Sequence, residues 1–134
     1  MDPAPAASPS QTIAFTRRLE AVPARGLDFL ALSPPDEPQF AWSAPDGGVL
    51  MVAWGRALDI LSRPGDLDDL GHRCGQATAA VRWAGDRDSP ARPRWIGGFA
   101  FAAATRDPAW SAFPPAQFTL PAATLAVARD SAWL

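Results

Sequence analysis

The segment 95–101, Trp-Ile-Gly-Gly-Phe-Ala-Phe, constrains the fold most strongly, because it has no polar face. In an extended strand, successive side chains point to opposite faces. Trp95, Phe99 and Phe101 then share one face, and the other face is also free of polar side chains. We therefore predict a strand over 94–102 that is covered on both sides.

The adjacent glycines of this strand, Gly97 and Gly98, add no side-chain packing. Glycine inside a strand weakens it and is typical of a bulge or of a close approach by another backbone. The sequence leaves both alternatives open.

A β-hairpin is predicted where 39–43 and 49–54 flank the turn sequence Ala-Pro-Asp-Gly-Gly. Proline presets one turn dihedral, and glycine adopts the positive φ that such turns need. Gly55 is expected to end the second strand. The following segment, 57–61, fits either a continuing strand or a connection.

Two further elements are predicted before this hairpin. The apolar positions in 12–22 alternate irregularly with charged ones, which favours a first strand. The short apolar segment 26–32 ends at Ser33-Pro34-Pro35, and we expect one to two helical turns there.

One amphipathic helix is predicted over 66–83. Its apolar residues recur at intervals of three and four, with Asp66 as N-cap and further acids in the first turn, where they suit the helix dipole. The stripe consists of Leu67, Leu70, Cys74, Ala77 and Val81. Residues 85–93 read as a loop rich in Asp, Arg and Pro.

The C-terminal region is predicted to be a strand over 119–129, a turn at Asp130 and the start of a hairpin partner at 131–134. A strand ending at Trp133-Leu134 would expose unpaired backbone groups and an apolar edge. Either the chain is a truncated piece, or these residues pair with an earlier strand.

Composition favours a soluble cytoplasmic protein with one packed domain over 11–134, after a disordered lead-in, 1–10, of Pro, Ala and Ser. The 134 residues are 48% hydrophobic, carry a formal charge of −2 and include one cysteine. This charge predicts neither nucleic acid nor an anionic membrane as a partner. The lone cysteine fits a reducing compartment, and no apolar run is long enough to span a bilayer.

Isolated reactive side chains do not form a recognisable catalytic set. His72 is the only histidine and lies off the helix stripe, so we expect it in solvent, without metal partners. Cys74 lies on the stripe and is expected to be a small buried hydrophobe, nearly opposite His72 on the helix. The acids Asp66, Asp68 and Asp69 fit helix capping better than cation binding.

The remaining candidates lack the sequence context of known motifs. Four serines are expected in loops rich in Pro and Gly, and none has the sequence of a nucleophile elbow around it; they are Ser43, Ser62, Ser89 and Ser111. All twelve basic residues are arginines, so a phosphate-binding loop would have no lysine. We accordingly predict no catalytic, cofactor-binding or metal-binding residue in this chain.

Four blocks, in order, resemble the N-terminal part of isochorismate synthases, members of the chorismate-utilising family that also includes anthranilate and aminodeoxychorismate synthases. The most specific is Gly-Gly-Phe-x-Phe followed by a Trp, a Phe-Pro and a Phe-x-Leu-Pro. The blocks occupy 27–30, 38–57, 94–101 and 110–121. One departure is Ala102, where such proteins usually carry an acid.

The resemblance implies an α+β fold of antiparallel sheet layers with flanking helices, here an incomplete part of a larger domain. It also implies conversion of chorismate with Mg²⁺, a lysine base that activates water, a glutamate acid and further glutamates on the metal. A base with a tuned pKa and hard oxygen ligands for Mg²⁺ suit this chemistry.

None of these residues can be carried over to this chain. It has no lysine, and its glutamates, Glu20 and Glu37, lie outside the matching motifs. The catalytic motifs of the family follow this region, so we expect an inactive N-terminal fragment of an isochorismate synthase of menaquinone or siderophore biosynthesis, possessing scaffold strands and partnered by the missing C-terminal part. Alternatives are a fragment of an anthranilate, aminodeoxychorismate or salicylate synthase, or a stand-alone non-catalytic binding module.

Overall fold

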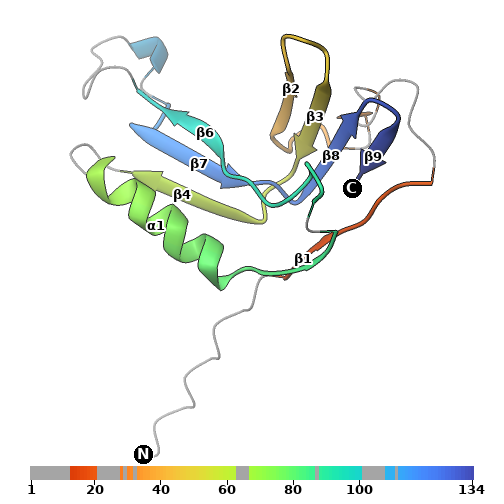
Figure 1. Ribbon diagram of the computed structural model, residues 1–134. Helices are drawn as coiled ribbons and strands as arrows, with labels where there is room; N and C mark the ends of the chain where they lie inside the picture. Colours follow the sequence, from red (N-terminus) through yellow and green to blue (C-terminus); the bar gives the residue numbers. More distant parts are fainter. Residues whose placement is uncertain are drawn as a thin grey trace, which may run out of the picture.

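The computed structural model describes residues 13–20, 28, 30–31, 33–62, 67–86, 88–100, 108–110 and 112–134. Three sheets and one α-helix make up this part of the chain, as Figure 1 shows. The elements in order are β1 (Ile13–Thr16), β2 (Gln39–Ser43), β3 (Val49–Trp54), β4 (Leu58–Ser62), α1 (Leu67–Ala80), β5 (Arg82–Gly85), β6 (Ile96–Phe99), a 3-10 helix (Pro108–Trp110), β7 (Ala116–Leu120), β8 (Ala123–Ala128) and β9 (Ser131–Trp133). The fold is α+β with mainly antiparallel pairing, which confirms the predicted class.

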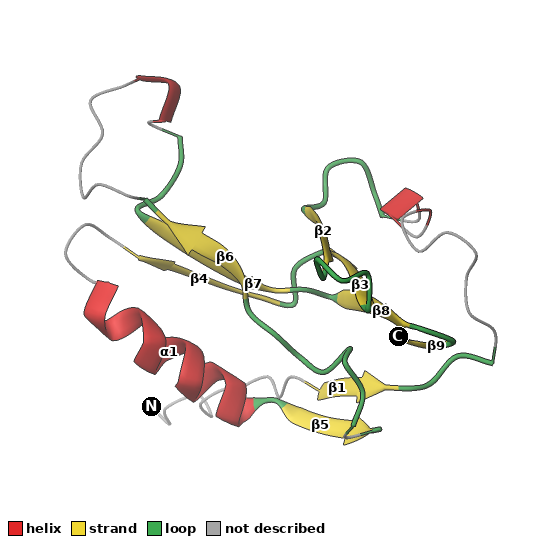
Figure 2. Ribbon diagram, turned by 45° about the horizontal axis from the view of Figure 1, so that its top comes forward, coloured by secondary structure: helices red, strands yellow, loops and turns green. Residues whose placement is uncertain are grey.

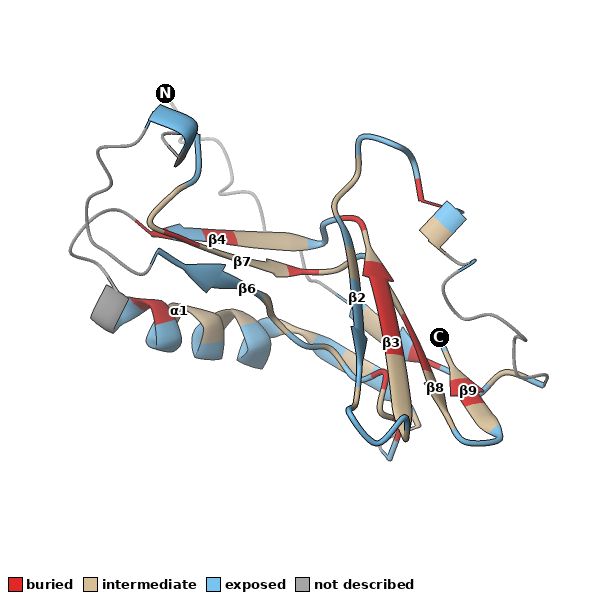
Figure 3. Cartoon of the chain, turned by 90° about the horizontal axis from the view of Figure 1, so that it is seen from above, coloured by how far each residue is buried: buried red, intermediate tan, exposed pale blue. Residues whose placement is uncertain are grey.

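The four-stranded sheet has the order β2-β3-β8-β9 and contains the two largest fully buried side chains of the described residues. Val52 and Leu125 lie opposite each other on β3 and β8 and are both 0% exposed. Figure 3 shows buried positions along β3 and β8, and others on β4, β7, β9 and α1. The predicted β2–β3 hairpin is confirmed, with Gly47 at φ 69° in its turn.

The three-stranded sheet has the order β4-β7-β6, and α1 packs on one of its faces (Figure 2). Ile60, Leu70 and Ala116 form the buried centre of this contact. The helix stripe accounts for it, because Cys74 and Ala77 pack against the same cluster. Residues 57–61, left open by the sequence, belong mostly to β4.

The predicted strand over 119–129 is wrong as a single element. The chain forms β7 and then β8, which belong to different sheets. Pro121 lies at the break, where it has no N–H to donate to a ladder. Beside this break, the chain also passes from β3 in one sheet to β4 in the other. Two backbone hydrogen bonds join the two crossings: Ala57 N donates to Leu120 O at 2.8 Å, and Ala122 N donates to Trp54 O at 3.1 Å.

The helix prediction extended too far at its C-terminal end. α1 ends at Ala80, and 82–85 form β5, which pairs in parallel with β1. Tertiary contacts outweigh the helical spacing here: the Trp83 indole N–H donates to Thr16 Oγ1 at 2.7 Å. Gly85 has φ 114°, a conformation that ends regular structure.

The first predicted strand is shorter than 12–22, because β1 covers only Ile13–Thr16. The following residues pair instead with the C-terminal strand. Arg17 and Leu134 exchange two backbone hydrogen bonds of 2.9 and 3.0 Å, and Leu19 N donates to Ala132 O at 2.8 Å. Of the two alternatives for residues 131–134, pairing with an earlier strand is therefore what the structure contains.

The two glycines of β6 have different surroundings. A Cβ on Gly97 would lie 2.0 Å from the carbonyl oxygen of Gln117 on β7, whereas a Cβ on Gly98 would meet nothing within 4 Å. Close approach, not a bulge, explains Gly97. The strand expected over 94–102 is β6, which begins at Ile96, and the expected cover on both faces is not met within the described residues, since Phe99 is 69% exposed.

Some expectations lie wholly or partly outside the described residues. The lead-in 1–10 and the N-cap Asp66 are not described. Of the helical turns expected over 26–32, residues 28, 30 and 31 are described, and they have 3-10 conformation. The side-chain amide of Gln39 joins this segment to β2 by donating to Leu30 O at 3.2 Å.

We predict that Gly97→Ala destabilises the chain by about 1–3 kcal/mol, because the added methyl group must displace the backbone of β7. Gly98→Ala is the matched control and should change the unfolding free energy by less than about 0.5 kcal/mol. Urea unfolding followed by tryptophan fluorescence measures both. Equal effects at the two positions would contradict the close-approach assignment.

Candidate functional site

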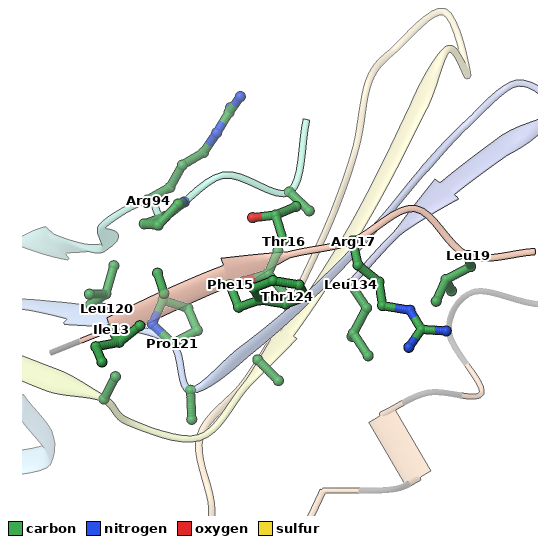
Figure 4. Close-up of a pocket in the computed structure, with 16 residues that line it drawn as sticks. Ile13, Phe15, Thr16, Arg17, Leu19, Arg94, Leu120, Pro121, Thr124 and Leu134 are labelled. Atoms are coloured by element: carbon green, nitrogen blue, oxygen red, sulfur yellow. The ribbon is translucent and has the colours of Figure 1, made fainter. Parts of the chain in front are cut away.

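One hollow lies between β1 and the link from β7 to β8, and has a volume of about 440 Å³. Figure 4 shows its walls. They are mainly apolar, with Ile13 and Phe15 on β1, Leu120 and Pro121 at the sheet break, and Leu134 at the end of the chain.

Two arginines lie on the margin of this hollow without converging on it. In Figure 4 the Arg94 side chain extends away from the apolar group, and Arg17 runs along the side of Leu134 and Leu19. Both arginines are solvent-exposed. Clustered, convergent polar groups are what orient a bound small molecule, so this hollow suits an apolar polypeptide segment better than a charged metabolite.

A second hollow, of about 420 Å³, lies between α1 and the edge of the three-stranded sheet. Most of the side chains that line it are aromatic or aliphatic, and Cys74 is also in the lining. The other lining residues are Leu70, Gly71, Trp95, Phe99 and Phe118. Burial raises the pKa of the Cys74 thiol, and the positive charge of Arg73 partly offsets this. The prediction of a small hydrophobic role fits, although Cys74 is only partly buried.

The other face of the three-stranded sheet has a polar cluster that the sequence analysis missed. Asp59 on β4 accepts hydrogen bonds from Thr119 Oγ1, from Gln117 Nε2 at 3.5 Å and from Arg56 at 3.1 Å. Asp59 and Thr119 are paired across β4 and β7. Alternation along β4 could have placed Asp59 on the face opposite Ile60, but the partners follow only from strand register.

His72 is exposed, as predicted, and its ring is 2.8 Å from the Gln76 amide, one helical turn away. Asp69 is exposed in the first turn of α1. Among the described residues there is no group of three or more His, Cys, Asp or Glu side chains able to hold a metal ion.

The serines are not all in loops. Ser43 and Ser62 lie in β2 and β4, which corrects the predicted placement; strand pairing, invisible in local composition, decides it. Ser89 is in a loop, is 2% exposed, and its hydroxyl accepts a hydrogen bond from Ala91 N at 3.0 Å. Ser111 is outside the described residues. Glu20 and Glu37 lie in separate irregular segments.

The chain matches the family described as chorismate binding enzyme over residues 4–134. This match covers nearly the whole sequence, so the chain belongs to the chorismate-binding enzyme family. No curated protein and no solved structure matches it. No helix in the described ranges is long and apolar enough to cross a membrane.

We predict that Asp59→Ala lowers the unfolding free energy by about 1–3 kcal/mol, because three donors lose a partly buried acceptor. Asp59→Asn should cost less, since its amide oxygen can still accept from Thr119. The control Asp69→Asn, at an exposed helical position, should cost a few tenths of a kcal/mol. Chemical denaturation compares the three, and equal losses for Asp59→Ala and the control would refute the cluster's contribution.

We predict that the Cys74 thiol reacts more slowly with iodoacetamide in the folded chain than in the urea-unfolded chain. Burial raises its pKa, so less reactive thiolate is present at a given pH. The rate should rise with pH along a curve displaced to higher pH than that of the unfolded chain. Mass spectrometry follows the reaction, and superimposable curves would contradict this environment.

Proposed function

We propose that this chain is the N-terminal scaffold part of an isochorismate synthase, a cytoplasmic enzyme that converts chorismate to isochorismate. The observation that carries the proposal is the ordered set of sequence blocks within the family match. The isochorismate branch is favoured over anthranilate synthase because the chain lacks the leucine-rich, acidic tryptophan-sensing segment found near the start of many anthranilate synthases.

The reaction of the proposed parent adds water at one ring carbon of chorismate and expels hydroxide from another. It needs a base to activate the water and an acid to protonate the leaving hydroxide. The chain has no lysine for the first role. Its glutamates, Glu20 and Glu37, lie in segments that carry no matching motif. We propose that the base, the acid and the Mg²⁺ ligands all belong to the remainder of the parent.

The contribution of this chain to the parent enzyme would then be structural. Its two antiparallel sheets place an uncovered strand edge and two apolar hollows where further elements of the same domain can pack. Burial of such surface is the main favourable term when two parts of one domain associate. The scaffold thus supports a catalytic site without contributing a catalytic residue.

The experiment compares this chain with the protein encoded by its complete reading frame, each incubated with chorismate and Mg²⁺. We expect isochorismate from the longer protein and no turnover by the 134-residue chain. Chromatography of the products makes the measurement. Anthranilate, aminodeoxychorismate or salicylate would assign a sibling enzyme, turnover by the short chain would refute the scaffold role, and a reading frame that stops at Leu134 would favour a stand-alone module.

A further inference from the structure

The hollow beside β1 has the geometry of a position for one further strand. β8 pairs with β3 along its whole length, Ala123–Ala128, but with β9 only over Ala126–Ala128. Along the same side of β8, the residues Ala123 and Thr124 line the hollow. β9 lies beside only the second half of β8, and Leu134, which follows β9, is among the residues that line the hollow.

The opposite wall of the hollow is β1, and the residues that follow β1 pair with the C-terminal segment 132–134. Arg17 exchanges backbone hydrogen bonds with Leu134, and Leu19 N donates to Ala132 O. Backbone groups of a strand alternate in direction, so Phe15 and Ile13 direct theirs to the same side. Thr16 O faces the other way, since it accepts from Asp86 N beyond β5.

The two walls are held at the separation that one strand requires. β9 pairs with β8 on one side and with residues 17–19 on the other. Neighbouring strands lie about 4.7–4.9 Å apart, so β8 and the chain at Arg17 are about two strand spacings apart. Beyond Leu134, β1 and the first residues of β8 continue on either side of the hollow (Figure 4).

The pairing of β1 with β5 alone also indicates that β1 lacks a second neighbouring strand. They form a two-stranded parallel sheet, and Ile13 and Phe15 are 71% and 68% exposed. Parallel strands occur almost only within larger sheets that are covered on both faces. One strand between β1 and β8 would join β5 and β1 to the β8-β3-β2 strands in a single sheet.

We propose that this slot receives one extended β-strand, supplied by the polypeptide that follows Leu134 in the longer protein. The inference rests on the proposed function for the existence of that polypeptide. Its register follows from Arg17 opposite Leu134: the second residue after Leu134 lies opposite Phe15, and the third lies opposite Ala14. The strand presents apolar side chains to Ile13 and Phe15 and backbone groups to both walls.

The test extends this chain after Leu134 with the strand-forming tail Thr-Val-Cys-Val-Thr-Val, in a Cys74→Ala, Ala14→Cys background. Arg17 and Leu134 form a hydrogen-bonded pair, so Ala14 and the third tail residue form a non-hydrogen-bonded pair. The Cα atoms of such a pair are about 4.5 Å apart, which is within the range of disulfides. We expect an intramolecular disulfide in the oxidised monomer.

The matched control carries the tail Thr-Cys-Val-Val-Thr-Val, whose cysteine points to the opposite face of the sheet. We expect little disulfide from it. Equal cross-linking by both tails, or none by the first, would overturn the proposal. A disulfide-linked dimer would assign the slot to a second copy and would also overturn it. Non-reducing electrophoresis and mass spectrometry of the monomer distinguish these outcomes.

A second measurement needs no cysteine. With the tail Thr-Val-Thr-Val-Thr-Val, amide hydrogen exchange at Phe15 and Thr124 should slow at least about tenfold, because both amides gain a partner. The Ala14 amide, which faces β5, is the internal reference. Unchanged exchange at Phe15 would overturn the proposal. These results do not depend on chorismate turnover, so failure of the slot and failure of the proposed function remain distinguishable.

Discussion

The structure depends on one point where two paired strands change sheet together. Gly55 and Pro121-Ala122 lie side by side there, and the bonds from Ala122 to Trp54 and from Ala57 to Leu120 flank the bend. A Cβ on Gly55 would lie 2.8 Å from the Ala122 methyl carbon, and Gly55 has φ 72°. This contact permits only glycine without strain. It orients β3 and β8 in one sheet and β4 and β7 in the other.

The two sheets then acquire different surroundings. The β2-β3-β8-β9 sheet contains the fully buried pair Val52 and Leu125, whereas the three-stranded sheet is covered by α1 on one face and has the Asp59 cluster on the other. The hollow beside the bend results from the same divergence, because Leu120, Pro121 and Thr124 line it from the two strands that separate. The proposed scaffold role is supported by these uncovered edges and by no reactive side chain of the described residues.

Much of the local structure could be predicted because it depends on short-range chemistry. Turn residues predicted the β2–β3 hairpin, and the three-and-four spacing of Leu70, Cys74 and Ala77 predicted the face of α1 that is buried. The isolation of His72 on the exposed side of α1 followed from the same periodicity. The family could be identified from the sequence because its motifs are local and ordered, and the match over 4–134 agrees with it.

The sequence by itself determined the hairpin, the amphipathic helix, the absence of lysine and the membership of the chorismate-binding family. Tertiary structure alone decided that 82–85 leave the helix to pair with β1, that β7 and β8 separate at Pro121, and that Asp59 meets Thr119. It also decided that Arg17 pairs with Leu134. The physical reason is common to these four cases: backbone pairing between segments distant in the chain depends on register and space, which neither propensity nor periodicity encodes.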